Sequence, residues 1–190
     1  TTSNIPRGLI LLAVSLCTML YAITLTIVNV VLPQMQGALS ATPDQISWDV
    51  TLNVIATAVA NPMNGWIVAR WGYRNVLLWS IIGFSIASVL CALADTLVPL
   101  LIYRVGQGAF GAPLVPLAQA IIVAVYPPER RAFAQGIVGI AVVIGPAIAP
   151  ALGGYLSEAY NWRMVFLLIL PLCAATFIAV WPVSYTHLTL

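Results

Sequence analysis

Charged residues are scarce in this sequence, and lysine is absent altogether. Only 6% of the 190 residues are charged, whereas 62% are hydrophobic. A water-soluble domain has about 25% charged residues, so this composition excludes an ordinary soluble globule. It indicates a protein that passes through a lipid bilayer several times, with the bilayer as its main partner.

Residues that commonly ligate metals or act in catalysis are also few. Cys17, Cys91 and Cys173 form no C-x-x-C pair, and the only histidine is His187. We therefore expect the cysteines to be apolar packing residues, and we expect no metal site and no cofactor. An enzyme within the membrane would need a nucleophile with a base. The apolar stretch around Ser85 offers neither histidine nor lysine, so we expect no enzymatic activity.

Six apolar stretches account for most of the chain. Each has about 18–27 residues, enough at ~1.5 Å per residue to cross a hydrocarbon core of ~30 Å as a helix. The stretches are residues 8–32, 48–69, 76–94, 99–125, 133–156 and 164–181. The sequence therefore predicts an all-α membrane protein with six transmembrane helices.

The basic residues are distributed unevenly between the gaps that separate these stretches. Alternate gaps contain the arginines Arg7, Arg70, Arg74, Arg130 and Arg131. The remaining gaps contain Asp44, Asp95, Glu158 and Arg163. Because positively charged loops stay in the cytoplasm, we expect a multi-pass protein of the cell membrane whose N-terminus is cytoplasmic. The basic residues form no single patch, so no nucleic-acid partner is expected.

The two ends of the chain differ from its apolar middle. Residues 1–7 are expected to be a cytoplasmic segment, and residues 8–182 the six-helix membrane part. The polar run 183–190 lacks the basic residues that usually follow a last span, so it is either a native tail or foreign sequence. The chain has no initial methionine and no cleavable signal pattern, which predicts a fragment or a processed protein.

Residues 65–78 resemble residues 154–167, which lie 89 positions further along the chain. Glycine, aromatic residues, arginine, valine and leucine match in type at corresponding places. A unit of three spans is odd in number, so a second unit would be inverted relative to the first, as in secondary transporters. The alternative is chance similarity between two short helix–turn–helix joints.

The first of these joints has features of a mechanical latch. Gly65 would let two helices approach closely, and Gly72 would permit a tight turn. Arg70 and Arg74 could reach helix carboxyl ends or acidic side chains across the cytoplasmic face. We therefore predict a gating loop, although two arginines that only fix the topology would look the same.

The gap before the second span ends in Thr42-Pro-Asp-Gln45, the pattern of a capping box with proline at the first helical position. Asp44 is therefore interpreted as structural. Asp49, beside Trp48, is interpreted as an anchor at the membrane interface, and a chemical role is the alternative. No carboxylate is then expected deep inside any span.

The fourth span contains a charged residue in an apolar setting. Arg104 keeps its charge, and an arginine near a helix centre costs about 2.5–3.5 kcal/mol on insertion scales. Gln107 lies on nearly the same helix face. We predict that both residues face a transport cavity, together with Thr24, Asn29 and Asn53. The alternative is that Arg104 extends to the outer headgroups.

The fifth span has a face of small residues. Ala141, Gly145, Ala149 and Gly153 recur at four-residue spacing, with Gly154 next to the last of them. Such faces let membrane helices touch backbone to backbone. Pro146 and Pro150 in the same span can soften a helix. The pattern predicts a packing seam. This seam could either be a gate that bends when a pathway opens or be a plain packing interface.

Three of these motifs resemble the signature motifs of the major facilitator superfamily. They are Arg70-x-Gly-x-Arg74 after Gly65, Arg104-x-x-Gln-Gly-x-x-Gly-Ala, and Gly145-x-x-x-Ala-Pro-x-x-Gly-Gly154. Residues 26–33 and 126–131 are similar to the EmrB/QacA branch of fourteen-span drug/proton antiporters. The resemblance implies the N-terminal six-helix half of a transporter that works by alternating access. A small-molecule substrate and a missing C-terminal half would be its partners.

Three positions depart from that branch. Thr24 stands where the branch usually has an acid in the first span, Ala69 where it has an acid before its arginine, and Ala149 where it has glycine. A threonine cannot bind and release a proton at physiological pH. The substitutions leave an uncoupled facilitator and a non-transporting scaffold or sensor as alternatives to multidrug efflux.

Overall fold

The computed structural model describes residues 7–183, and helices make up almost all of this part. The helical elements are α1 (Arg7–Ala38), α2 (Pro43–Ala60), the 3-10 turn η1 (Asn61–Met63), α3 (Asn64–Leu93), α4 (Leu97–Gly111), α5 (Leu114–Val125), α6 (Pro128–Ala159) and α7 (Met164–Val183). No strand occurs among these residues. The all-helical prediction is confirmed, and the tail 184–190 lies outside the described residues.

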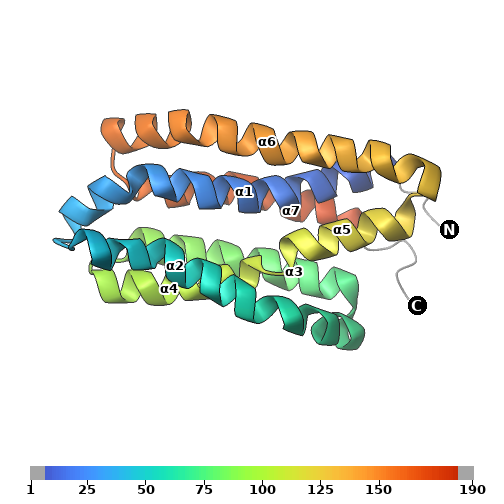
Figure 1. Cartoon of the computed structure of the whole chain (residues 1–190), viewed down its shortest axis with the longest axis horizontal. Helices are drawn as coiled ribbons and strands as arrows, with labels where there is room; N and C mark the ends of the chain where they lie inside the picture. Colours follow the sequence, from blue (N-terminus) through green and yellow to red (C-terminus); the bar gives the residue numbers. More distant parts are fainter. Residues whose placement is uncertain (1–6, 184–190) are drawn as a thin grey trace.

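The helices form an elongated bundle in which α6 lies along α1 and α2 lies along α4 (Figure 1). The start of α1 and the connection from α5 to α6 lie at one end, where the hydroxyl of Tyr126 donates a 2.8 Å hydrogen bond to the carbonyl oxygen of Arg7. The α3–α4 and α6–α7 connections meet at the other end. There Arg163 Nη2 lies 3.0 Å from Asp95 Oδ1 and 2.9 Å from the carbonyl oxygen of Ala94.

Five helical segments are long and apolar enough to cross a membrane. One of them, Pro43–Leu93, is 51 residues long and contains both the second and the third predicted spans. Within it Gly72 has φ 76° and ψ 156°, which is not helical. Figure 1 shows the ribbon of this segment running to one end of the bundle and then back. The expected tight turn at Gly72 is therefore present, but the structure does not show six separate helices.

The predicted span 99–125 is also divided differently from the expectation. It consists of α4 and α5, which are separated at Ala112 and Pro113. Proline has no backbone N–H and its ring clashes with the preceding turn, so Pro113 and Pro116 prevent a regular helix through this point.

The start of α2 has the predicted capping box. The hydroxyl oxygen of Thr42 accepts a 3.2 Å hydrogen bond from the backbone N–H of Gln45, and the side-chain oxygen of Gln45 accepts a 3.0 Å bond from the N–H of Thr42. Each bond satisfies a backbone donor that the helix itself leaves open.

The interior of the bundle is apolar, and so is much of its exterior. Cys17 and Cys173 lie in one buried cluster and Cys91 in another, so their predicted packing role is confirmed. Large apolar side chains such as Trp79 and Ile178 are exposed, at 61% and 70%. Exposed apolar surface on this scale suits a lipid environment rather than water.

We expect Gly72→Ala to destabilise the protein by about 1–3 kcal/mol, because a side chain is strained at this backbone conformation. The control is Gly65→Ala, since Gly65 shows no positive φ and an added Cβ there meets no atom within 4 Å. Unfolding of the purified protein in mixed micelles, followed by circular dichroism, measures the difference. Equal stability of the two variants would contradict the role of Gly72.

Candidate functional site

A buried ion pair joins α2 and α4 inside the bundle. Arg104 Nε of α4 lies 3.0 Å from Asp49 Oδ2 of α2, and both side chains have 0% exposure. The interpretation of Asp49 as an interfacial anchor is therefore wrong, as is the expectation that no carboxylate lies buried in a span. Arg104 has no exposed surface, so in this structure it faces neither an open cavity nor lipid headgroups.

The ion pair belongs to a larger polar network. Arg104 Nη1 donates a hydrogen bond to Gln107 Oε1. Gln107 Nε2 donates to Ser88 Oγ of α3 at 2.8 Å, and Ser88 donates to the carbonyl oxygen of Phe84 at 2.8 Å. The guanidinium also lies 5.9 Å from the ring centre of Phe166 in α7. Helices α2, α3 and α7, together with α4 itself, thus position the groups that surround Arg104.

The network leaves some polar atoms without a hydrogen-bond partner. Within the described residues, Asp49 Oδ1 and Arg104 Nη2 are buried and accept or donate no hydrogen bond. Removing two charges from water costs several kcal/mol for each ion, and the attraction between them offsets this cost only when their remaining bonds are also made. Such incompletely satisfied charges inside a membrane protein usually mark a functional site.

Side chains of α2 and α3 also bond to backbone oxygens of α4 and of the residue after it. Asn53 Nδ2 donates to the carbonyl oxygen of Arg104 (3.0 Å), Thr57 Oγ1 to that of Gly108 (3.0 Å), and Asn64 Nδ2 to that of Ala112 (3.3 Å). The three acceptors are four residues apart and therefore lie on one helix face. A Cβ on Gly108 would collide with the carbonyl oxygen of Asn53, so glycine is required for this close approach.

The bond from Asn64 has a specific cause in the sequence. Pro116 has no N–H to offer to Ala112, the residue four positions before it. Ala112 would then keep an unpaired carbonyl oxygen in an environment without water, and such a group costs several kcal/mol. Asn64, which is buried, supplies the missing donor from α3.

The structure brings together only part of the predicted cavity set. Arg104, Gln107 and Asn53 belong to one network. Thr24 is buried and donates within its own helix to the carbonyl oxygen of Leu20 at 2.8 Å. Asn29 is exposed and donates to the carbonyl oxygen of Leu25 at 2.6 Å.

The sequence contained a signal for the missed partner of Arg104. Asp49, Asn53 and Thr57 follow one another at four-residue spacing, which places them on one face of a helix. A polar face on an apolar helix is expected to meet another polar group within the bundle. The adjacent Trp48 indicates only an interfacial position for Asp49 and gives no sign of this pairing.

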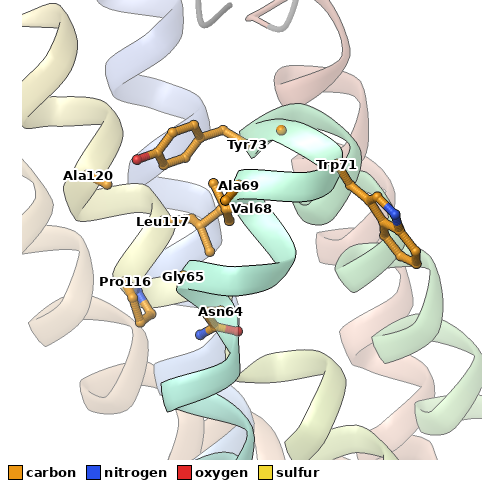
Figure 2. A pocket seen from close by; sticks show the side chains of 10 residues that line it. Asn64, Gly65, Val68, Ala69, Trp71, Tyr73, Pro116, Leu117 and Ala120 are labelled. Carbon is orange, nitrogen blue, oxygen red and sulfur yellow. The ribbon is translucent and has the colours of Figure 1, made fainter. Parts of the chain in front are cut away.

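The predicted gating loop borders a hollow of about 660 Å³ between α3 and α5. Figure 2 shows the side chains of Trp71 and Tyr73 directed to opposite sides of the turn. Arg70 lies 5.9 Å from the ring centre of Trp66, and Arg74 lies 5.5 Å from that of Trp181.

Gly65 also lines this hollow. An added Cβ at Gly65 would meet nothing within 4 Å. The predicted close helix contact at this glycine is therefore not present.

The small-residue face of α6 packs on α1. A Cβ at Gly145 would lie 2.8 Å from Ile23 Cγ1, and one at Gly153 would lie 2.8 Å from Ile27 Cγ1. Ala149, between them, is buried. The predicted packing seam is present. Pro146, Pro150 and Gly154 lie within an uninterrupted α6, and a Cβ at Gly154 would meet no neighbour.

Comparisons with known proteins agree on one family. Residues 14–187 match the sequence model described as Major Facilitator Superfamily. The chain is 36% identical over 164 residues to the multidrug export protein EmrB of Escherichia coli K12, which covers 86% of this chain and 32% of that protein. The chain thus spans about a third of the length of this relative.

Solved structures show the same fold. A D-xylose–proton symporter superposes with a TM-score of 0.82 at 14% identity, covering 92% of this chain and 48% of that one. A bacterial homolog of the human lysosomal transporter Spinster, in an inward-facing and occupied conformation, gives a TM-score of 0.76 at 27% identity. It covers 93% of this chain and 44% of that one.

We expect Gly153→Val to destabilise the protein by about 1–3 kcal/mol, because extra atoms at a packed contact force neighbouring side chains and backbone to shift. Gly154→Val is the control, since it adds the same atoms at the adjacent position where space is open. The same unfolding assay in micelles compares them. Equal stability of the two variants would contradict close packing of α6 on α1 at Gly153.

Proposed function

Since this chain belongs to the major facilitator superfamily, we propose that it is the N-terminal half of a secondary transporter that exports small molecules by alternating access. The observation that carries this proposal is the 36% identity to a multidrug export protein across 86% of the chain. The fold supports transport in general, and the sequence similarity supports export of drug-like compounds in particular.

The proposed half crosses the membrane six times. The segment Pro43–Leu93 has 51 residues. A straight helix of this length would extend about 75 Å, more than twice a ~30 Å hydrocarbon core. A reversal at Gly72 turns this segment into two crossings, which with the four other apolar segments makes six.

The two similar joints support an inverted repeat. Residues 65–78 surround the turn at Gly72, and residues 154–167 include the connection from α6 to α7. The two connections lie at opposite ends of the bundle in Figure 1. Two three-helix units of opposite orientation would place them in this way.

The arginine-rich end of the bundle is proposed to face the cytoplasm. The start of α1, the turn at Gly72 and the start of α6 lie at this end (Figure 1). They contribute Arg7, Arg70, Arg74, Arg130 and Arg131. The N-terminus would then be cytoplasmic by the positive-inside rule.

Transport requires a second half, because substrate sites of this class lie at the midplane between two repeats. We propose that such a half covers the exposed surface that includes Asn29, and that substrate passes between the two halves. The loop with Gly65, Arg70, Gly72 and Arg74 would act as a cytoplasmic gate. Pro146 and Pro150 would let α6 bend as its seam with α1 adjusts.

We expect cysteines placed at Asp44 and Arg74 to differ in accessibility. In a background without Cys17, Cys91 and Cys173, a membrane-impermeant thiol reagent added to intact cells should label position 44 and leave position 74 unlabelled. Both positions should react after the cells are opened, which serves as the control. Labelling of position 74 from outside would reverse the proposed orientation.

Arg104→Ala should abolish export by the complete gene product that contains this chain, because it leaves Asp49 buried and unpaired. Export of a fluorescent drug is measured in cells that lack their own exporters, at matched amounts of protein in the membrane. The control variant is Arg163→Ala, which removes a partly exposed arginine at the same end of the bundle. Unchanged export by the Arg104 variant would remove Arg104 from the mechanism.

A further inference from the structure

We propose that Asp49 is a proton-binding site of this protein, which takes up and releases one proton on its carboxylate while Arg104 stays charged. Only the coupling of this proton to transport rests on the proposed transport function. Binding itself is a property of the pair and can be measured without any substrate.

The geometry of the pair provides the first argument. Asp49 Oδ2 faces Arg104 Nε at 3.0 Å, so this oxygen is occupied by the guanidinium. Asp49 Oδ1 is buried and has no hydrogen-bond partner within residues 7–183. An oxygen with free lone pairs beside a paired one is where a proton can add without first breaking a hydrogen bond.

The surroundings of the pair leave Asp49 as the group that can exchange a proton. An arginine guanidinium is not a proton-exchanging group in proteins, and the amide of Gln107 and the hydroxyl of Ser88 are not acids or bases in this pH range. From α3, the thiol of Cys91 is close enough to interact with both charges. Between Gly8 and Ala38, α1 has no acidic or basic residue, and α7 has none at all.

The charge balance links the proton to a change of conformation. With Asp49 ionised, the pair has no net charge. When the carboxylate accepts a proton from hydronium, the O–H bond forms on Oδ1, a water molecule is released, and the site is left with the single positive charge of Arg104. An uncompensated charge in a closed apolar site is strongly unfavourable. Protonation therefore favours a conformation in which water or another group reaches Arg104.

The closed structure gives the proton no route to water. Asp49 and Arg104 have no exposed surface, so exchange requires that α2 and α4 separate near the pair. Further along the same interface, Thr57 and Asn64 hold backbone oxygens of Gly108 and Ala112. The first bond joins α2 to α4, and the second joins α3 to the residue that follows α4. Both can stay formed while α2 and α4 separate near Asp49, which couples proton binding to opening.

Infrared difference spectroscopy tests proton binding directly. The complete gene product, reconstituted in liposomes with Cys91→Ala to remove the thiol, is taken through a series of pH values with no substrate present. We expect a carboxylic-acid band of a buried group that disappears in Asp49→Asn. The controls are Asp44→Asn and Asp95→Asn, which change exposed carboxylates and should keep the band. A band that is unchanged in Asp49→Asn would overturn the proposal.

Transport in the same liposomes separates the two proposals. With a fluorescent drug as probe, Asp49→Asn should lose all stimulation of drug movement by a pH gradient. Asp49→Glu should regain part of the stimulation. Gradient-driven movement that persists in Asp49→Asn contradicts the role of Asp49. Absence of any movement by the wild type contradicts the export function and leaves the infrared result as an independent test.

The double variant Asp49→Asn with Arg104→Gln distinguishes proton binding by the pair from a purely structural role. Removing both charges avoids an unpaired buried ion, so this variant should fold and insert even if Asp49→Asn does not. It should show neither the infrared band nor stimulation by a pH gradient. If the double variant keeps either one, another group binds the proton and the proposal fails.

Discussion

The need to satisfy polar groups without water determines how α2, α3 and α4 are joined. Within the hydrocarbon of a bilayer, each unpaired backbone group costs several kcal/mol. Because Pro116 has no N–H, the carbonyl oxygen of Ala112 lacks its usual donor within the helix, and Asn64 donates a hydrogen bond to it from a neighbouring helix. The same interface contains the pair of Asp49 and Arg104, whose charges can lie in the interior because they lie together. Polar contacts therefore define this part of the bundle.

The opposite side of the bundle is held by close apolar contact. Along α6, the backbone at Gly145 and Gly153 lies directly against the side chains of Ile23 and Ile27 of α1. Van der Waals contact between small and branched residues has little directional preference, whereas charge pairs and hydrogen bonds are sensitive to distance and angle. The chain thus combines an interface that tolerates small shifts with an interface whose ion pair and hydrogen bonds need a specific geometry.

Local patterns in the sequence were sufficient for the helical class, the capping box at Thr42, the turn at Gly72 and the packing seam, because each depends on residues close together in the chain. The pairing of Asp49 with Arg104 could not be read in this way. The two residues are separated by the turn at Gly72 and by all of α3, and their contact depends on how three helices pack. The division of α4 from α5 was missed for a different reason, since Pro113 was considered only as part of an apolar stretch.

Arginine side chains lie on indole rings at both ends of the bundle: Arg70 on Trp66 and Arg74 on Trp181 at one end, and Arg163 on Trp162 at the other. Indole rings favour the headgroup layer of a bilayer, and arginine side chains near helix ends extend to the same layer. A bundle fastened in both leaflets has a fixed depth. Such a bundle can tilt more easily than it can move up or down in the membrane. A rigid-body movement of this half would therefore be a rotation about an axis in the membrane plane, with little displacement along the bilayer normal.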